Sequence, residues 1–251
     1  MTAAPLLLLI DAGNTRIKWA LAEAGARPGA WIASGAVAHA DLNHLPGAWP
    51  RSGIARALVS NVAGARLRDQ LQLMIPTTDI TWFASAERVG GMHNGYRNPA
   101  QLGCDRLAAA LGARALAPGQ ALIVATCGTA TTIDAVSAAG DFLGGMILPG
   151  LGLMAASLAR GTAQLPQIDP ARSLPAGFAD NTDDAILSGC LAAQAGAIES
   201  AFALHGAALC IVSGGAAPFI APQLAVPHRM VDNIVLTGLQ QAANASDYTT
   251  G

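Results

Sequence analysis

Residues 11–19, DAGNTRIKW, combine side chains and a spacing that could do chemistry on phosphate groups. They follow five apolar residues at 6–10, which predict a buried strand that ends at Asp11. Glycine in the turn lets backbone N–H groups approach an anion, and the Asn and Thr side chains add hydrogen-bonding groups. The Asp11 carboxylate could hold a divalent cation that screens the phosphates, and Lys18, the only lysine of the chain, adds positive charge.

The same layout returns in the middle of the chain. In ALIVATCGTATTIDAV, residues 121–136, an apolar strand leads into Gly128 and Thr129 and then into a second strand. A third glycine turn, SGG at 213–215, opens a predicted helix, where an anion can bind. Taken alone, the first turn is more typical of an ordinary hairpin and the third of an ordinary helix entry, whereas the second fits a hairpin and a phosphate site equally. Together and in this order, the three turns predict a nucleotide in a cleft between two similar halves.

The stretch GCDR, residues 103–106, could supply proton transfer and anion binding. Asp105 and Arg106 fall in the first turns of an Ala-rich helix, where the helix dipole alone would favour an aspartate. If that helix is buried, however, the carboxylate and the guanidinium need partners or a ligand. Asp105 could accept a proton from a hydroxyl substrate, and Arg106 could bind a carboxylate through two parallel hydrogen bonds.

Composition excludes several classes of protein. The chain has 251 residues, of which 52% are hydrophobic, so it can bury the core of one large domain or two small ones. A net charge of −2 with 12% charged residues gives no basic field for nucleic acid. The scattered Cys104, Cys127, Cys190 and Cys210 predict neither a disulfide framework nor a zinc site. Without a signal segment or an evident membrane span, we expect a cytoplasmic protein.

Apolar patterning predicts the elements that position these residues. In the first half, strands are predicted at 6–10, 17–21, 29–38, 55–62 and 79–85, a helix at 63–75 and a loop at 90–99. The first two strands form a hairpin, and the helix joins the last two by a parallel crossover. A helix then begins at residue 98, with Asn98 as its cap and Pro99 at its first position.

The second half starts again at residue 121 with strand, turn and strand. Beyond it we predict a strand at 142–150, helices at 151–166, 181–206 and 231–243, a loop at 167–180, and a strand, turn and helix at 208–224. Asn181 or Thr182 caps the long helix. Aligning Gly13 with Gly128 superposes the halves, which suggests a duplication. The expected fold is α/β, with domains at 1–118 and 119–251.

Seven motifs along the chain resemble those of one family, the type III pantothenate kinases, to which the Bvg accessory factors also belong. They are DAGNTRIKW (11–19), GYRNPAQLGCDR (95–106), CGTATTID (127–134), GGMILPG (144–150), TAQLP (162–166), NTDDAILSG (181–189) and SGG (213–215). The resemblance covers nearly the whole chain. It implies a homodimer with the two-domain fold of the acetate and sugar kinase, actin and heat-shock ATPase superfamily.

The resemblance also implies roles for individual residues. ATP would contact Asp11, Ala12, Gly13, Asn14, Thr15, Arg16, Lys18, Gly128 and Thr129. Pantothenate would contact Tyr96, Gly103, Cys104, Asp105, Arg106 and Thr182, with Asp105 as the proton acceptor. Tyr96 could equally anchor its loop, and a helix cap would by itself explain Thr182.

The implied cations are Mg²⁺, with Asp11 as its ligand, and a monovalent cation, K⁺ or NH₄⁺. The family's second phosphate motif usually begins with an aspartate, and this chain has Thr126 at that position. The carboxylate expected to hold the monovalent cation is therefore missing, which places that site in doubt.

Three functions are compatible with these residues. The first is ATP-dependent phosphorylation of pantothenate to 4′-phosphopantothenate, the first step of coenzyme A biosynthesis. The second is a non-catalytic, nucleotide-binding regulatory module of the same fold. The third is a sugar or acetate kinase, which the GCDR motif together with Tyr96 disfavours. Asp11, Asp105 and Arg106 together favour catalysis, because a pure switch needs no base beside an anion-binding group.

Overall fold

The computed structural model describes residues 4–161 and 177–245. The chain forms two compact units. The first comprises Met1–Gly119, Gly140–Leu143 and Asn233–Gly251, and the second comprises Gln120–Ala139 and Gly144–Asp232. The sequence predicted a single boundary after residue 118. The chain instead returns twice to the first unit, at residues 140–143 and with its C-terminal helix.

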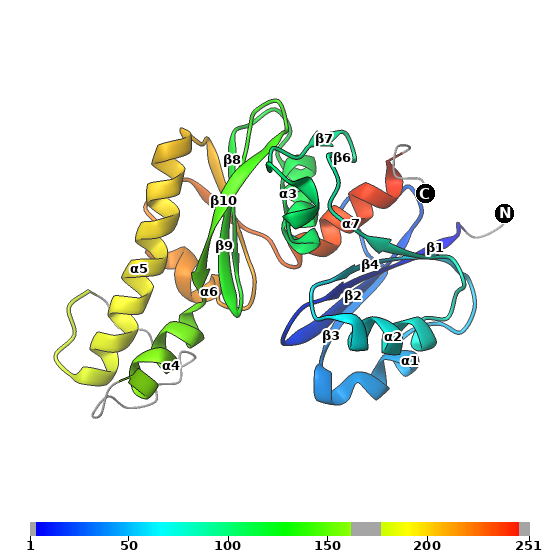
Figure 1. Ribbon diagram of the computed structural model, residues 1–251, viewed down its shortest axis with the longest axis horizontal. Coiled ribbons are helices and arrows are strands. Elements are labelled where there is room, and N and C mark those ends of the chain that lie inside the picture. Colours follow the sequence, from blue (N-terminus) through cyan, green and yellow to red (C-terminus); the bar gives the residue numbers. More distant parts are fainter. Residues whose placement is uncertain (1–3, 162–176, 246–251) are drawn as a thin grey trace. The chain divides into compact units, whose positions relative to one another are not determined.

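The first unit is built on a five-stranded sheet (Figure 1). In spatial order its strands are β3 (Ala33–Ala38), β2 (Arg16–Glu23), β1 (Leu6–Ala12), β4 (Ile54–Asn61) and β5 (Ile80–Phe83). β1, β2 and β3 pair antiparallel, whereas β1, β4 and β5 pair parallel. The predicted hairpin and the predicted parallel crossover are both confirmed.

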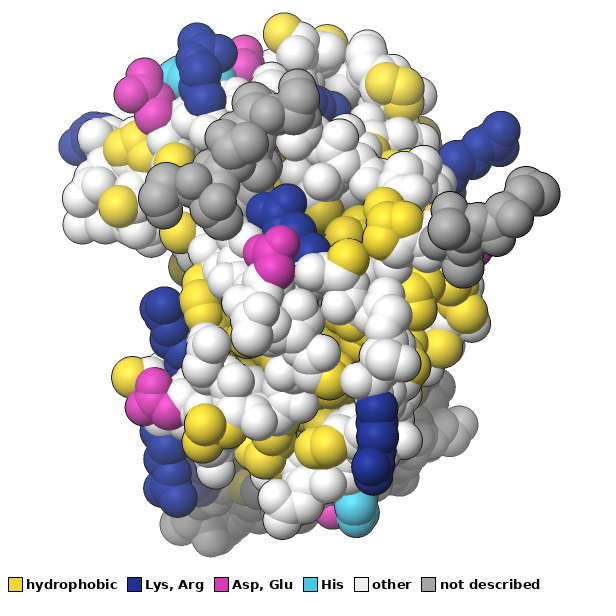
Figure 2. Space-filling model, turned by 90° about the vertical axis from the view of Figure 1, so that its right-hand side faces the viewer, with side chains coloured by type: hydrophobic (Ala, Val, Ile, Leu, Met, Phe, Trp, Pro, Cys, Tyr) yellow, Lys and Arg dark blue, Asp and Glu magenta, His cyan; other side chains and the backbone are white. Residues whose placement is uncertain are grey.

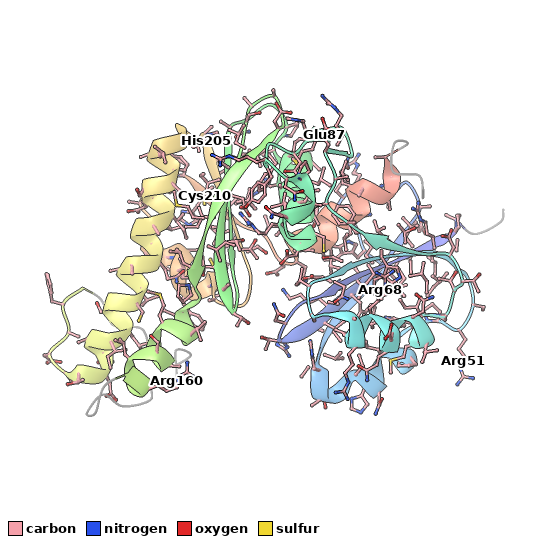
Figure 3. The ribbon with its side chains drawn as sticks, in the orientation of Figure 1. Arg51, Arg68, Glu87, Arg160, His205 and Cys210 are labelled. Carbon is pink, nitrogen blue, oxygen red and sulfur yellow. The ribbon has the colours of Figure 1, made fainter. Side chains whose placement is uncertain are left out.

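Helices cover both faces of this sheet. On one face lie η1 (His39–His44), α1 (Leu45–Ala48) and α2 (Ala65–Met74), and on the other lie α3 (Cys104–Leu116) and α7 (Ile234–Asn244). Of these, η1 and α1 were not predicted. Alternate strand residues such as Leu8 and Ile10 pack against Leu67 and Leu71 of α2. Arg68 belongs to α2 (Figure 3), and its guanidinium carbon lies over the ring of Trp82, 4.6 Å from the ring centroid.

The segment that leads into α3 differs from the prediction of one helix beginning at residue 98. Asn98 does act as a cap, since its side chain accepts a hydrogen bond from Ala100 N at 3.2 Å. The helix that it caps is only the short 3₁₀ helix η2 (Pro99–Gln101), and α3 starts afresh at Cys104 with Gly103 as its N-cap. Asp105 therefore lies in the first turn of an α-helix, where four backbone N–H groups lack helical partners.

Glycines let α3 and α7 approach closely. A Cβ on Gly238 of α7 would lie 1.7 Å from Ala108 O, and one on Gly112 of α3 would lie 2.6 Å from Ile234 O. Any larger residue at these positions would push the helices apart. This contact holds the C-terminal helix in the first unit and fixes α3 on the sheet.

The second unit repeats the sheet of the first. Its strands run in the order β10 (Phe142–Pro149), β9 (Ala130–Val136), β8 (Leu122–Cys127), β11 (Leu209–Ser213) and β12 (His228–Met230). β8 and β9 pair antiparallel, and β8, β11 and β12 pair parallel. The two sheets share one topology, which supports the suggested duplication. The short strand β12 was not predicted, nor was the small hairpin of β6 (Arg88–Val89) and β7 (Met92–His93).

Helices α4 (Leu151–Gly161), α5 (Thr182–His205) and α6 (Ala217–Ile220) pack on one face of this second sheet, followed by the 3₁₀ helix η3 (Ala221–Gln223). The cap of α5 is Asn181, whose side chain accepts a hydrogen bond from Asp184 N at 3.0 Å. At the other end of α5, His205 Nε2 lies 2.9 Å from Val136 O (Figure 3). Residues 162–166 of the predicted helix and most of the predicted loop at 167–180 lie outside the described residues.

No membrane span was predicted from the sequence, yet α5 meets the length and composition required of one. Among the described helices it alone does so. Residues such as Leu187, Leu191 and Ile198 of α5 are buried in the core of the second unit. That burial is typical of the core helix of a globular domain.

Candidate active site

Asp11 lies near the carboxyl end of β1, on the sheet face that carries α3 and α7. Its register partners are Lys18 on β2 and Ser60 on β4. Directly paired residues point to the same face of a sheet, so the three side chains are neighbours. The end of the sheet therefore brings a carboxylate, an ammonium group and a hydroxyl together.

The ionised form of Asp11 is destabilised in the ligand-free protein. Burial raises the pKa of Asp11 to about 7, the negative charge of Asp105 adds to this, and Lys18 opposes it. Burial likewise raises the pKa of Asp105, against the opposing effects of the backbone N–H and the guanidinium of Arg106. A carboxyl that resists ionisation beside a second carboxyl is suited to a cation, which would stabilise both negative charges.

Asp105 is held at the start of α3 by its neighbours in the sequence. Its Oδ1 accepts a hydrogen bond from Arg106 N at 2.9 Å. Gly103 leaves room for this carboxylate, because a Cβ there would lie 2.6 Å from Asp105 Oδ1. The adjacent Cys104 Sγ lies 3.3 Å from Ser60 Oγ, which ties the start of the helix to the end of β4.

Arg106 is buried beside two aromatic rings. The residue is 7% exposed, and its Nη1 donates a hydrogen bond to the Tyr96 hydroxyl at 2.8 Å. Its guanidinium carbon lies 5.7 Å from the centroid of the Tyr96 ring and 5.9 Å from that of Phe142. A planar guanidinium in such surroundings fits a carboxylate ligand, because its charge is poorly solvated and its orientation is fixed.

The first glycine turn closes the β1–β2 hairpin. Gly13 N donates a hydrogen bond to Arg16 O at 3.2 Å. Asn14 and Thr15 at its tip are exposed. His39 Nε2 lies 2.8 Å from Gly13 O, so η1 supports this turn from the side.

The second glycine turn, in the second unit, is held by close backbone contacts. Gly150 N donates a hydrogen bond to Thr129 O at 2.9 Å, and a Cβ on Gly150 would lie 2.1 Å from Gly128 O. On another side, a Cβ on Gly214 of the SGG turn would lie 2.3 Å from Cys127 O. Glycine is required at both positions, because only a residue without a side chain allows the backbones to meet.

Comparison with known proteins gives the family. Residues 7–204 match the family model described as type III pantothenate kinase. The type III pantothenate kinase of Janthinobacterium sp. (strain Marseille) is 54% identical over 253 residues, which cover 95% of this chain and 97% of that protein. That of Herminiimonas arsenicoxydans is 54% identical over 251 residues, with the same coverage. The chain belongs to the type III pantothenate kinase family.

Solved structures confirm the predicted fold class. A protein from Campylobacter jejuni assigned to the Baf family of transcriptional activators aligns with a TM-score of 0.64 at 20% identity, covering 94% of this chain and 96% of that one. The activator of 2-hydroxyisocaproyl-CoA dehydratase from Clostridium difficile, with bound ADPNP, aligns with a TM-score of 0.57 at 14% identity, covering 96% and 94%. At these identities the likeness establishes the fold alone. That fold is the one shared by acetate and sugar kinases, actin and heat-shock ATPases.

The residues that the type III pantothenate kinase motifs implicate fall into two sets. The first unit brings together Asp11, Ala12, Gly13, Asn14, Thr15, Arg16 and Lys18 on the hairpin with Tyr96, Gly103, Cys104, Asp105 and Arg106 around the start of α3. The second unit holds Thr126, Gly128 and Thr129 at the second turn and the exposed Thr182 at the start of α5. Because Asn181 is the cap of α5, capping does not account for Thr182.

Ser60, His39 and Phe142 contact these residues but were not predicted as site residues. Ser60 could have been found, because it lies near the end of the strand predicted at 55–62 as parallel to that at 79–85, and ligands bind at the carboxyl ends of parallel strands. His39 and Phe142 carry no such signal. His39 lies on η1, which was not predicted, and the strand predicted at 142–150 gave no sign of what its first residue would contact.

Cys127, Cys190 and Cys210 are buried, and Cys104 is partly buried. All four are free thiols. Burial raises the pKa of Cys127 and of Cys210, which lies inside the second unit on β11 (Figure 3), to about 12. Burial also raises the pKa of Cys104. These thiols stay protonated and are poor nucleophiles at neutral pH.

Replacing Gly150 with alanine is expected to displace the second glycine turn, because the new Cβ would clash with Gly128 O. We expect the KM for ATP to rise at least about tenfold, the effect of about 1.4 kcal/mol of lost binding. Steady-state kinetics with ATP as the varied substrate checks this. The matched control is Gly196→Ala on α5, where a Cβ meets nothing within 4 Å. Equal ATP kinetics in both variants would show that the turn does not contact the nucleotide.

Proposed function

We propose that this protein transfers the γ-phosphoryl group of ATP to the primary hydroxyl of pantothenate. The observation that carries the proposal is the pairing of Asp105 with the buried Arg106 at the start of α3, next to Asp11. Membership of the type III pantothenate kinase family supplies the substrate and the reaction. The product, 4′-phosphopantothenate, is the first intermediate on the way to coenzyme A.

In this proposal each group around α3 has a defined role. Asp105 accepts the proton of the attacking hydroxyl, and its raised pKa makes its carboxylate a stronger base than an ordinary aspartate. Arg106 binds the carboxylate of pantothenate, assisted by Tyr96, Gly103, Cys104 and Thr182. Phosphoryl transfer depends mainly on alignment and charge stabilisation, so holding the hydroxyl in line with the phosphate is the principal task of the site.

We further propose that ATP is contacted by residues 11–18 of the first unit, and also by Gly128 and Thr129 of the second unit. Mg²⁺ accompanies ATP, and the residues present fit it, since Asp11 is a carboxylate whose ionised form needs a positive partner. Within the described residues no group of three or more His, Cys, Asp or Glu side chains could hold a metal unaided. This agrees with a cation bound by one or two carboxylates and by the nucleotide phosphates, whose negative charge it screens.

Arg106→Ala is expected to weaken pantothenate binding by about 2–5 kcal/mol, because it removes one partner of a buried ion pair. The affinity for ATP should stay the same. Isothermal titration calorimetry with each ligand measures both affinities. Arg68→Ala is the control, since Arg68 belongs to the same unit, is exposed, and packs over the ring of Trp82. Pantothenate affinity that survives Arg106→Ala unchanged would remove Arg106 from the site.

The residues at the expected monovalent cation site do not fit a cation well. Thr126 offers a neutral hydroxyl, and its register partner on β9 is Thr132, another neutral hydroxyl. In the described part of the chain, both Oγ1 atoms are buried and lack hydrogen-bond partners. Hydroxyl oxygens can contact K⁺, but without a carboxylate they supply no compensating charge.

We therefore expect a reduced dependence on K⁺ or NH₄⁺. Activity with saturating Mg²⁺ and ATP should fall less than about tenfold when both ions are replaced by a bulky organic cation at constant ionic strength. Thr126→Asp, which restores the charge, should increase the response to K⁺. Loss of all activity in the organic cation would contradict this expectation.

We also propose a cytoplasmic homodimer. Large apolar side chains are exposed on β10 and α4 of the second unit, namely Met146, Ile147, Leu153 and Leu158. A second copy of the chain would remove them from water.

On the face in Figure 2, Lys and Arg side chains lie apart from one another and form no continuous basic patch of the kind that binds nucleic acid.

An ADP-release assay tests the proposed function against the other two. The protein is mixed with ATP and, separately, with pantothenate, a panel of sugars, and acetate. A kinase specific for pantothenate releases ADP only with pantothenate. ADP release with a sugar or acetate would identify a different acceptor, and release that depends on none of them would favour a regulatory module.

A further inference from the structure

Phe142 belongs to the first unit, and no motif in the sequence assigned it a role. It is fully buried, and it begins β10, which belongs to the second unit from Gly144 onward. Its ring meets that of Tyr96 edge to face, with centroids 5.7 Å apart and planes inclined at 63°. The guanidinium carbon of Arg106 lies 5.9 Å from the centroid of the Phe142 ring.

The backbone of Phe142 also fixes the loop that carries Tyr96. Gly95 N donates a hydrogen bond to Phe142 O at 2.8 Å, and a Cβ on Gly95 would lie 2.7 Å from the same oxygen. Only glycine permits this approach, so the loop and the strand end meet in one defined register. Tyr96, the next residue, is thereby placed against both Phe142 and Arg106.

Asn94 holds this loop from its other side. Its residue is 2% exposed, and its Nδ2 donates hydrogen bonds to Ala86 O at 3.2 Å and Pro99 O at 3.1 Å. Its Oδ1 accepts a hydrogen bond from Tyr96 N at 3.1 Å. A buried amide with these three bonds ties the loop at three points, so Tyr96 has little freedom to move.

We propose that Phe142 is a positioning residue that sets the specificity for a carboxylate substrate. Its ring holds Tyr96 and Arg106 in one arrangement, so the guanidinium is already oriented when the anion arrives. Attraction between the cation and the negative faces of the rings takes the place of lost hydration. The proposal rests on the proposed function insofar as the carboxylate is that of pantothenate.

The test compares pantothenate with pantothenol, in which an alcohol replaces the carboxylate and the reacting hydroxyl is retained. Phe142→Leu keeps an apolar side chain and the backbone carbonyl but removes the ring. We expect kcat/KM for pantothenate to fall about tenfold, mainly through KM, as loss of a desolvated cation–π contact implies. The value for pantothenol should change less than twofold. Phe178→Leu, at a fully exposed phenylalanine, is the matched control.

A second variant guards against a general packing defect in Phe142→Leu. Tyr96→Phe keeps the ring on Phe142 and removes only the hydroxyl that accepts from Arg106. Tyr96→Phe should lower the ratio of kcat/KM for pantothenate to kcat/KM for pantothenol, and its melting temperature should equal that of the wild type. An equal loss for both substrates in Phe142→Leu, or no loss for either, overturns the proposal.

Calorimetric affinities for the two ligands separate this proposal from the proposed function. A wild-type protein that prefers pantothenate over pantothenol but phosphorylates neither overturns the kinase assignment, while the affinity ratio of Phe142→Leu still decides the positioning role. A wild-type protein that binds the two ligands equally overturns the positioning role, because there is then no carboxylate selectivity to set.

Discussion

Asp105→Asn should lower kcat by about 10²–10⁴-fold, the range typical of losing a general base. Asparagine has the shape of aspartate but cannot accept the proton of the attacking hydroxyl. Its side-chain oxygen can still accept the hydrogen bond from Arg106 N, so the start of α3 should be preserved. Single-turnover kinetics with saturating ATP and pantothenate measure the loss.

The matched control is Asp69→Asn, at an exposed aspartate on α2 of the same unit. Its kcat should equal that of the wild type. Because burial raises the pKa of Asp105, the acid limb of the wild-type pH profile should lie above the usual range of an aspartate. Asp105→Asn with wild-type turnover and an unchanged fold would show that Asp105 is not the proton acceptor.

Asp11→Asn should abolish activity and yet stabilise the ligand-free protein at neutral and alkaline pH. The pKa of Asp11 is about 7 in the folded protein, against 3.8 as its ordinary value. Between these pH values the folded state binds the extra proton, so the stabilisation present below pH 3.8 is lost as pH rises through 7. A pKa difference of about 3 corresponds to at most about 4 kcal/mol, since Asp11 is partly exposed and solvent screens its charge.

Urea unfolding followed by tryptophan fluorescence between pH 4 and 8 measures this effect. The difference in unfolding free energy between Asp11→Asn and wild type should grow with pH and level off above 7. Adding Mg²⁺ and ATP should raise the stability of the wild type much more than that of the variant. If Asp11→Asn were less stable than the wild type at pH 8 without ligands, the ionised form of Asp11 would not be destabilised in the folded protein.

Much of the fold follows from local patterns in the sequence. The strands that hold Asp11, Lys18 and the two glycine turns appear as apolar runs next to Gly and Thr, because a central strand must be apolar and a tight turn needs glycine. In contrast, η1, α1 and β12 are short and depend on packing against the sheets. The return of α7 to the first unit depends on Gly112 and Gly238, and a glycine inside a helix gives no sign of what it contacts.

The candidate site was predicted residue by residue but not as an arrangement. The motifs identified Asp11 and Asp105 separately, and only the fold brings the two carboxylates close enough for one to raise the pKa of the other. The break between η2 and α3, which puts Asp105 in a first helical turn, arises at Leu102 and Gly103. A continuous helical pattern concealed it, because Leu is common in helices and one glycine is tolerated.

The central claim is that this chain phosphorylates pantothenate with Asp105 as the base. The most direct test incubates the wild type and Asp105→Asn with ATP labelled in the γ-phosphate, Mg²⁺ and pantothenate, and identifies the labelled product by mass spectrometry. The account predicts label on the primary hydroxyl of pantothenate, formed about 10²–10⁴ times faster by the wild type than by the variant. Label that appears only as inorganic phosphate, or equal rates for the two proteins, would contradict it.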